Sequence, residues 1–593
     1  MKKLAFSISL PKRRTSILAV LLCGVMAIIV VQLFIIQVIQ HKKYKQAAFD
    51  EQVAKFILPA TRGEIYARDG SEVVPLVMNQ PVYLAFVDPQ EAGDEKDKDI
   101  LQDTMREIAG GNILDGYEKH LDDKKLRYVV AARNLSYAQA ELIKKKNLPG
   151  VGLTETQQRV YPEGALAAQV LGFVNNEGKG QYGVEEALNK RLKGVDGRLQ
   201  TVTDVRRIPL TISKEDISQP AENGQNIVLS IDRSVQSYAE QALKKGLDNV
   251  QATNGSVVVM NPNNGQVVAM ANYPSYNPAE FSKISDYSVL QNGVVSQPYE
   301  VGSVMKTLTM GAGLDSGAVT QNSTFNDSTG CVQVDDRKIC NVEEDPRTAG
   351  ATMLDVLHYS LNTGVDYILK QMGGGSFNRQ GRDKLYEYFK NHYRFAQNTG
   401  IEQAGEVPGV MIAPDKAEGN NVRYANMAFG QGMDITMIQM ASAFSAAING
   451  GTYYQPTLVS GKTSNGNDLK VQKPKVVGTG VLEPQTSEIL RNMIVEGRQL
   501  GVLGGKDPSG YAVGGKTGTS QIIDSKTGEY SDANSIGSYI GFGGTSGQAP
   551  QYVIMVMVKD SKAFGYAGTT AAGPIFQDIS DYMIQNLHLQ PNI

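Results

Sequence analysis

The chain has 593 residues, of which 20% are charged and 41% hydrophobic, and its formal net charge is -3. This length allows two to four domains, and the hydrophobic fraction is that of a folded protein rather than a disordered one. The charge balance has no basic bias, which argues against a nucleic-acid partner.

A basic tail and a long apolar run open the chain. Residues 1–15 carry five Lys or Arg residues, and between residues 17 and 39 only Gln32 and Gln37 interrupt the apolar side chains. As a helix this run would be about 34 Å long, enough to cross a hydrocarbon core of about 30 Å. No signal-peptide cleavage site follows it. We therefore predict a cytoplasmic tail at 1–15 and a single-pass anchor at 16–39 in the cytoplasmic (inner) membrane, with the residues from 40 onward outside.

The first soluble region extends over residues 40–224. Its pattern predicts a helix at 44–56, then a strand-like stretch at 62–70 that ends in an Asp-Gly turn signal. Residues 98–146 are charged and helical in pattern. No catalytic cluster occurs here, so we interpret the region as an interaction or spacer domain. The polar, Pro-containing stretch 217–225 marks its end.

The second region, 225–593, mixes strands and helices. The pattern predicts strands at 226–231 and 551–558, a hairpin at 256–260 and 266–271, and helices at 234–245, 353–359, 364–372, 434–448 and 574–587. Strands at both ends of the region with helices between them predict an α+β fold, in which the two ends build one antiparallel sheet beside a helical subdomain.

Two of the three cysteines flank a predicted hairpin. If the segment between Cys331 and Cys340 turns at Asp335 and Asp336, the two cysteines face each other as a non-hydrogen-bonded pair. Such pairs approach to about 4.5 Å between Cα atoms, which is within disulfide range. We predict a disulfide here, with two free buried thiols as the alternative. The third cysteine, Cys23, lies in the predicted anchor.

Ser303 and Lys306 form the pattern on which the functional prediction depends. The spacing of residues 304–314 predicts a helix that ends at Gly317, so Ser303 would lie at its N-terminus and share a face with Lys306. A serine hydroxyl becomes a strong nucleophile when a base takes its proton. Lysine can be that base only when burial or a nearby cation keeps it neutral. Alone, the pattern is common, and such a serine is more often a helix cap.

Two later motifs make the pattern specific. Ser360 and Asn362 form Ser-x-Asn between two predicted helices, and Lys-Thr-Gly-Thr occupies 516–519 after a strand-like stretch with two glycines. Ser-x-x-Lys, Ser-x-Asn and Lys-Thr-Gly in this order are the known set of penicillin-binding proteins and class A β-lactamases.

Other chemistries fit less well. Residues 510–517 formally match a phosphate-loop pattern, but such a loop opens a helix directly after its Lys-Thr, and here Gly518 follows. His358 lies near Ser360 but is expected to be an ordinary helical residue. Because the sequence has no Cys-x-x-Cys pair and no His-Glu-x-x-His, we expect neither a metal nor a cofactor.

With these motifs the chain resembles the class B penicillin-binding proteins, the single-pass, monofunctional transpeptidases of peptidoglycan synthesis. The resemblance covers nearly the whole part outside the membrane. Four stretches look like the family's pedestal or dimerisation domain, namely 62–65, 161–162, 171–173 and 183–185. Three later stretches look like its transpeptidase domain, namely 270–278, 429–432 and 541–542. The sequence departs from the family's pattern at Ala67, Val301 and Gly543-Gly544.

The resemblance implies roles for the matching residues in the reaction. Ser303 would attack the penultimate D-Ala carbonyl of a stem peptide, with Lys306 as the general base. Lys516 would lower the pKa of Lys306, Ser360 would relay a proton, and Asn362 would hold the amide of the donor peptide.

It also implies how the substrate binds. Thr517 and Thr519, with Gly518 between them, would bind the terminal carboxylate near Lys516. The N–H groups of Ser303 and Thr519 would form the oxyanion hole. β-Lactam antibiotics would mimic the substrate and trap Ser303.

Alternatives and partners follow from the same comparison of motifs. A D,D-carboxypeptidase or β-lactamase of the same fold, and a β-lactam sensor or inactive scaffold, are the competing interpretations. Residues 87–89 and 270–278 look more like the division (septal) branch than the elongation branch. The expected partners are peptidoglycan stem peptides, β-lactams, a membrane glycosyltransferase and proteins of division or elongation.

Overall fold

The computed structural model describes residues 12–45, 53–202, 217–341, 350–523, 530–562 and 567–592. Their contacts divide the chain into two units, one made of residues 1–61 with 194–223 and the other of 62–193 with 224–593. Each unit is described by itself.

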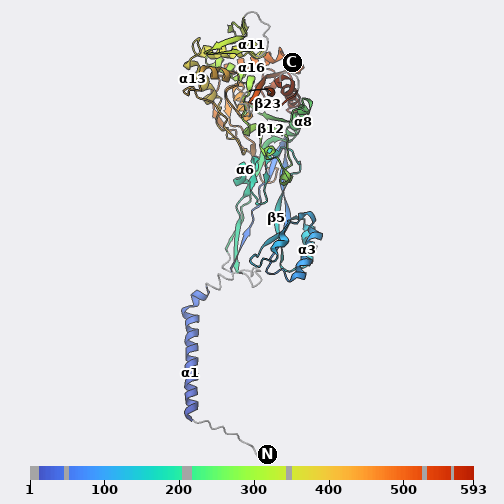
Figure 1. Cartoon of the computed structure of the whole chain (residues 1–593), viewed down its shortest axis with the longest axis vertical. Coiled ribbons are helices and arrows are strands. Elements are labelled where there is room, and N and C mark those ends of the chain that lie inside the picture. The colour runs from blue at the N-terminus through green and yellow to red at the C-terminus, as the bar shows by residue number, and fades with distance from the viewer. Residues whose placement is uncertain are drawn as a thin grey trace, which may run out of the picture. The chain divides into compact units, whose positions relative to one another are not determined.

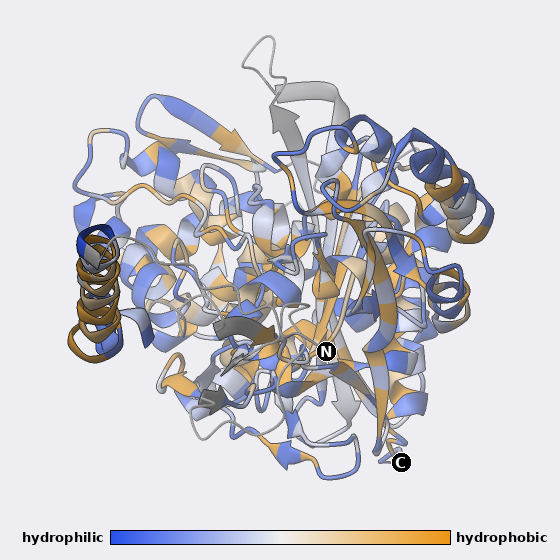
Figure 2. Cartoon of the chain, turned by 90° about the horizontal axis from the view of Figure 1, so that it is seen from below, coloured by the Kyte–Doolittle hydropathy of each residue, from blue (hydrophilic) through white to orange (hydrophobic). Residues whose placement is uncertain are grey.

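The first unit holds the apolar N-terminal helix. Helix α1 spans Lys12–Phe34 and continues into a π-helical turn at Ile35–Ile39. Residues Arg13–Ile39 have a mean hydropathy of 3.0 in their most apolar window, and none of that window is buried in the protein. Figure 2 shows the same helix, at the left, hydrophobic on every side. Its length and composition fit the predicted single-pass membrane anchor.

A three-stranded antiparallel sheet completes this unit. Strand β8 (Gly197–Val202) lies between β1 (Val53–Leu58) and β9 (Ile217–Gln219). The helix predicted for 44–56 is therefore wrong at 53–56, where the chain pairs with β8, and residues 46–52 lie outside the described part. A partner strand more than 100 residues away decides the structure here, which local periodicity cannot show.

The second unit begins with a hairpin and two further long strands. Strands β2 (Ile65–Asp69) and β3 (Glu72–Val87) pair through the predicted Asp-Gly turn, and β3 also pairs with β4 (Val129–Leu135) and β5 (Val151–Val160). Figure 1 shows β5 beside α3. The helical prediction for 98–146 is confirmed only in part. Helices α3 (Glu95–Ala109) and α4 (Tyr137–Lys145) form, but β4 lies between them.

A buried ion-pair network fixes the segments that carry the pedestal-like motifs. The carboxylate of Glu185 is completely buried and binds the guanidinium groups of Arg62 and Arg159, the second at 2.6 Å. Arg159 also donates to Asn79 on β3 at 2.8 Å. A buried carboxylate is tolerated where it is paired in this way. The network joins three segments that are far apart in the sequence.

One sheet combines strands from both predicted regions. Strand β10 (Asn226–Asp232) pairs in parallel with β2 and antiparallel with β18 (Val459–Thr463). The order is β19-β18-β10-β2-β3-β4, with β19 at Lys470–Val471 and β5 on β3. The domain boundary near residue 224 thus falls beside a strand that joins the two regions, and the boundaries 40–224 and 225–593 remain a prediction.

A five-stranded antiparallel sheet combines strands from both ends of the second region, as predicted. Its order is β12-β11-β23-β22-β21, with β11 at Asn254–Met260, β12 at Val267–Tyr273, β21 at Tyr511–Ile523, β22 at Tyr530–Thr545 and β23 at Tyr552–Lys559. Strands from the start of the region pair with a strand from its end, as predicted. Helices α8 (Arg233–Asn249) and α17 (Gly573–Asn586) pack together beside the sheet, and Figure 1 shows α8, β12 and β23 side by side.

The helical subdomain lies between these strands in the sequence. Its helices are α10 (Lys306–Asp315), α11 (Met353–His358), α12 (Asn362–Met372), α13 (Arg379–Glu387), α14 (Asn421–Ala428), α15 (Met437–Ile448) and α16 (Pro484–Gln499). Every residue of α15 is buried, so this apolar helix is a core element. It forms as predicted but starts three residues later than 434, because Thr436 caps it.

The remaining short elements connect these parts. They are α5 (Ala168–Leu171), α6 (Gly183–Ala187), α7 (Asn189–Lys193), α9 (Gly293–Ser296), β6 (Phe173–Val174), β7 (Gly180–Gln181), β13 (Thr324–Phe325), β16 (Ala351–Thr352), β17 (Tyr453–Tyr454) and β20 (Val476–Gly478). The hairpin of β14 (Cys331–Val334) and β15 (Arg337–Cys340) has the register expected from the sequence. A disulfide joins Cys331 and Cys340, whose Cα atoms are 4.0 Å apart.

Candidate active site

Ser303 lies where a tight loop enters a helix. It belongs to a 3₁₀ turn, Gly302–Met305, that runs directly into α10. Gly302 has φ +66°, and a Cβ atom there would lie 2.7 Å from the carbonyl oxygen of Thr519. A Cβ atom at Gly518 would likewise lie 2.7 Å from the carbonyl oxygen of Val301. The two glycines therefore let β21 approach the Ser303 turn backbone to backbone.

Lys306 joins the first motif to the second. It is completely buried at the start of α10, and its Nζ donates to the carbonyl oxygen of Ser360 and, at 3.2 Å, to the hydroxyl of Ser360. Ser360 lies in the turn between α11 and α12 with φ +57°. A non-glycine residue in this left-handed region is strained, and such strain often accompanies functional sites. The contact places the Ser-x-Asn turn against the lysine of Ser-x-x-Lys.

The electrostatics of Lys306 favour its neutral form. Burial lowers the pKa of this amine well below its usual value, and the positive charge of Lys516 lowers it further. The carboxyl group of Asp366 acts in the opposite sense but does not offset the other two. A lysine in this state can accept a proton from a neighbouring hydroxyl near neutral pH.

Lys516 comes from β21, the edge strand of the five-stranded sheet. Its side chain is buried, and its Nζ lies 3.1 Å from the carbonyl oxygen and 3.3 Å from the hydroxyl of Thr517. The hydroxyl of Thr519 accepts a hydrogen bond of 3.4 Å from the N–H of Gly568. Since residues 511–523 form a strand rather than a loop that opens a helix, the phosphate-loop interpretation is excluded.

Asn362 begins α12 and is almost completely buried. Its side-chain amide donates to the carbonyl oxygen of Cys340 at 2.9 Å, so the disulfide hairpin sets the orientation of this side chain. The side-chain oxygen of Asn341, next to the hairpin, accepts from both the N–H and the hydroxyl of Thr363. The hairpin is thus attached at two points to the start of α12.

Two neighbours of Lys306 were not singled out from the sequence as site residues. The ring centroid of Phe429 lies 6.0 Å from the Lys306 Nζ, and Gly430 in the same loop accepts the N–H of Gly302 at 3.1 Å. Residues 429–432 had been noted only as a family-like stretch. Asp366 is completely buried on α12. Its one signal in the sequence was that it is the only acid in the stretch 362–372.

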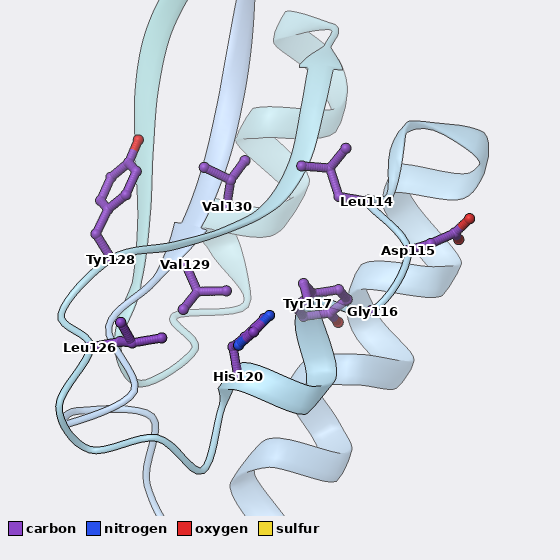
Figure 3. A pocket seen from close by; sticks show the side chains of 9 residues that line it. All are labelled: Leu114, Asp115, Gly116, Tyr117, His120, Leu126, Tyr128, Val129 and Val130. Carbon is purple, nitrogen blue, oxygen red and sulfur yellow. The ribbon is translucent and has the colours of Figure 1, made fainter.

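A separate cavity of about 310 Å³ lies near β4, away from these motifs. Figure 3 shows its lining, which includes Leu114, Leu126 and Val130 with the rings of Tyr128 and His120. Within the described ranges, no group of three or more His, Cys, Asp or Glu side chains could hold a metal ion.

Ser303 lies in the turn that leads into α10, whose first residue is the buried Lys306, and the edge strand β21 with Lys516 approaches this turn backbone to backbone. These are the parts of a serine acyltransferase or hydrolase that uses lysine in place of histidine.

The family comparisons agree with this class of enzyme. The penicillin-binding protein transpeptidase domain matches residues 255–581, and the penicillin-binding protein dimerisation domain matches residues 57–229. The first match covers more than half of the chain. The protein belongs to the penicillin-binding protein family, with a dimerisation domain followed by a transpeptidase domain, as the resemblance of its motifs implied.

Curated relatives match over nearly the full length. The chain is 30% identical to stage V sporulation protein D of Bacillus subtilis (strain 168), over 98% of this chain and 86% of that protein. It is 28% identical to peptidoglycan D,D-transpeptidase FtsI of Escherichia coli (strain K12), over 90% and 84%. Penicillin-binding protein 2X of Streptococcus thermophilus has the same fold, with a TM-score of 0.69 at 23% identity, over 90% of this chain and 80% of that one.

Proposed function

We propose that the protein is a peptidoglycan D,D-transpeptidase, which cross-links stem peptides through an acyl-enzyme at Ser303. The main observation behind the proposal is the environment of the buried Lys306 amine next to the turn that contains Ser303. This amine donates a hydrogen bond to Ser360, and the positive charge of Lys516 lowers its pKa. The relatives that are named peptidoglycan D,D-transpeptidases support the same reaction.

In the first half of the reaction Lys306 takes the hydroxyl proton of Ser303. The serine oxygen attacks the penultimate D-Ala carbonyl, and the resulting oxyanion accepts hydrogen bonds from the N–H groups of Ser303 and Thr519. A donor of this kind typically contributes about 3–4 kcal/mol to the transition state. When the C–N bond breaks, the proton passes to the leaving amine of the terminal D-Ala, with Ser360 as the relay.

The substrate binds along β21. As the edge strand of its sheet, β21 presents backbone groups to an extended peptide. Lys516, with Thr517 and Thr519 on either side of Gly518, binds the terminal carboxylate, and Asn362 holds the amide of the donor peptide. In the second half, an amine of a neighbouring stem peptide attacks the ester and releases Ser303. A β-lactam acylates Ser303 in the same way, but its amine stays attached to the acyl group, so no product leaves the enzyme.

Two other functions remain as alternatives. A D,D-carboxypeptidase or β-lactamase would release the acyl group to water, which requires a carboxylate placed to activate that water. A β-lactam sensor or scaffold needs no turnover, yet Ser303, Lys306 and Lys516 are all retained. The choice between an amine and water as acceptor separates the first alternative from the proposal.

We also propose a setting for the reaction. Helix α1 anchors the protein with residues 1–15 in the cytoplasm and residues from 40 onward outside. The dimerisation domain occupies 40–224 and contacts a membrane glycosyltransferase and other wall-synthesis proteins, and the transpeptidase domain occupies 225–593. Because residues 270–278 resemble the division branch, we place the enzyme in septal wall synthesis.

A partition experiment tests the proposed reaction. The full chain in detergent is given a thioester analogue of an N-acyl-D-Ala-D-Ala peptide and increasing concentrations of D-Ala as acceptor. The proposal predicts that the aminolysis product grows with acceptor at the expense of hydrolysis, and that Ser303→Ala forms neither product. Hydrolysis alone at every acceptor concentration would favour the carboxypeptidase. Wild-type enzyme that forms neither product would favour the sensor or scaffold.

A further inference from the structure

A loop with two glycines in the left-handed region borders the turn that contains Ser303. Residues 429–432 follow α14 directly, and Gly430 and Gly432 have φ +87° and +75°. A Cβ atom at Gly430 would overlap the carbonyl oxygen of Gly302, so the loop and the turn are in close backbone contact. Because glycine has access to many backbone conformations, the loop needs contacts of its own to keep one conformation beside the turn.

Glu300 makes such a contact from the segment that leads into the turn. Its carboxylate accepts the N–H of Gly432 at 2.7 Å, and the carbonyl oxygen of Gly432 accepts from Arg423 on α14 at 2.8 Å. The peptide groups of Gly432 are thus held from both sides. A hydrogen bond from a backbone N–H to an ionised carboxylate is one of the stronger kinds. The Glu300 side chain is half-buried, so a substitution can remove the contact without opening a cavity in the core.

Backbone hydrogen bonds join the same two segments on either side of this contact. Tyr299 and Ile435 exchange both N–H to carbonyl bonds, each at 3.1 Å. The N–H of Gly302 donates to the carbonyl oxygen of Gly430, also at 3.1 Å. Glu300 lies between these two connections, and its bond to the loop is the one that a side chain makes. That side chain therefore fixes the part of the loop that the backbone bonds leave unheld.

The loop also contacts the proposed base. The ring centroid of Phe429 lies 6.0 Å from the Lys306 Nζ, at the outer limit of a cation–π contact. Phe429 is almost completely buried and directly precedes Gly430. A shift of the loop would therefore move both the ring beside Lys306 and the carbonyl group that accepts the N–H of Gly302.

We propose that Glu300 is a positioning residue for acylation, which holds the 429–432 loop against the turn that contains Ser303. The inference rests on the proposed function. The proton passes from Ser303 to Lys306, and Glu300 neither gives nor takes it. Its bond to the loop keeps the turn and the Lys306 amine in their relative positions. Because a misplacement of about 1 Å can cost about 100-fold in rate, loss of this bond should slow acylation even when the protein stays folded.

Substitutions at Glu300 separate the length of the side chain from its charge. Glu300→Gln keeps an acceptor oxygen at the same distance from the backbone without the charge, whereas Glu300→Asp keeps the charge on a shorter side chain. The limiting acylation rate and the dissociation constant of the complex before acylation are measured by stopped flow, with the full chain in detergent and increasing concentrations of a chromogenic cephalosporin. In Glu300→Ala and Glu300→Asp the limiting rate should fall by about 10- to 100-fold, with the dissociation constant unchanged. Glu300→Gln should retain most of the wild-type rate.

Glu402→Ala is the matched control, because the carboxylate of Glu402 also accepts a backbone N–H, that of Leu458 at 3.0 Å, but outside the motifs. It should lower the melting temperature at least as much as Glu300→Ala and leave the limiting rate unchanged. If Glu300→Ala does not fold, Glu300→Asp, the smaller change, takes its place.

Three results would overturn the inference. They are a wild-type limiting rate in the folded Glu300→Ala or Glu300→Asp variant, a Glu300→Gln variant as slow as Glu300→Ala, and an equal loss of rate in Glu402→Ala. Wild-type protein that is not acylated at all overturns the proposed function instead, so the two failures are distinguishable.

Discussion

The side-chain amide of Asn362 donates a hydrogen bond of 2.9 Å to the carbonyl oxygen of Cys340, a residue of the disulfide. The disulfide closes the base of the β14–β15 hairpin, and Asn341 beside it binds Thr363 on α12. A residue of the Ser-x-Asn motif is therefore oriented by a covalently closed hairpin more than 20 residues earlier in the chain.

This relationship predicts a functional effect of the disulfide. A disulfide that closes a loop of this size reduces the conformational entropy of the unfolded hairpin, which destabilises the unfolded state by about 2–3 kcal/mol. In Cys331→Ser/Cys340→Ser the hairpin should open more often, and Asn362 should lose its fixed acceptor. We expect penicillin acylation to slow several-fold, with little change in global melting. Cys23→Ser, in the anchor, is the control and should behave as wild type. Equal acylation rates in all three proteins would contradict this prediction.

Lys306 is expected to be required for acylation but not for folding. In Lys306→Ala the base is lost, so acylation should fall by at least about 100-fold, the lower end of a general base's contribution. The melting temperature should change little, because the contacts of the amine with Ser360 and the Phe429 ring are offset by the cost of burying an amine. Lys306→Arg should also be inactive, since guanidinium does not deprotonate in proteins. A folded Lys306→Ala that acylates at the wild-type rate would remove this residue as the base.

Lys516 should set the pH at which acylation is lost on the acid side of its pH profile, where Lys306 becomes protonated. Its positive charge lowers the pKa of Lys306. Without it, in Lys516→Met, the Lys306 ammonium form becomes more favourable, so the acid limb of the acylation profile should move to higher pH. The maximal rate should fall as well, because the substrate carboxylate loses a partner. A profile of Lys516→Met whose midpoint stays in place or moves to lower pH would contradict the proposed coupling.

Gly302 should tolerate no side chain. Gly302→Ala combines a left-handed backbone, φ +66°, with a Cβ atom 2.7 Å from the Thr519 carbonyl oxygen. Gly317→Ala is the matched control, because Gly317 has φ +67° and open space around its Cβ position. The control should be destabilised by about 1 kcal/mol from backbone strain alone. Gly302→Ala should be destabilised more and should lose most of its acylation rate. Similar losses in the two variants would show that the contact with Thr519 is unimportant.

The site could be predicted from the sequence where local spacing determines it. The i, i+3 spacing of Ser303 and Lys306 and the register of the Cys331–Cys340 hairpin both follow from short-range geometry. A sheet joined by strands from both ends of the second region was also predicted, and β11 pairs with β23 in it.

Long-range packing determined what the sequence did not show. Strand β1 was taken for a helix because its partner β8 lies far along the chain, and β4 was missed inside a charged, helix-like stretch. The approach of Gly430 to Gly302 and the burial of Asp366 depend on how separate segments pack, which spacing along the chain does not encode.

The most direct measurement is the site of penicillin attachment. The full chain is incubated with a fluorescent penicillin, digested, and the labelled peptide is identified by mass spectrometry. We expect one adduct, on Ser303, and none in a folded Ser303→Ala variant. No adduct on the wild type, or equal labelling of Ser303→Ala, would contradict it.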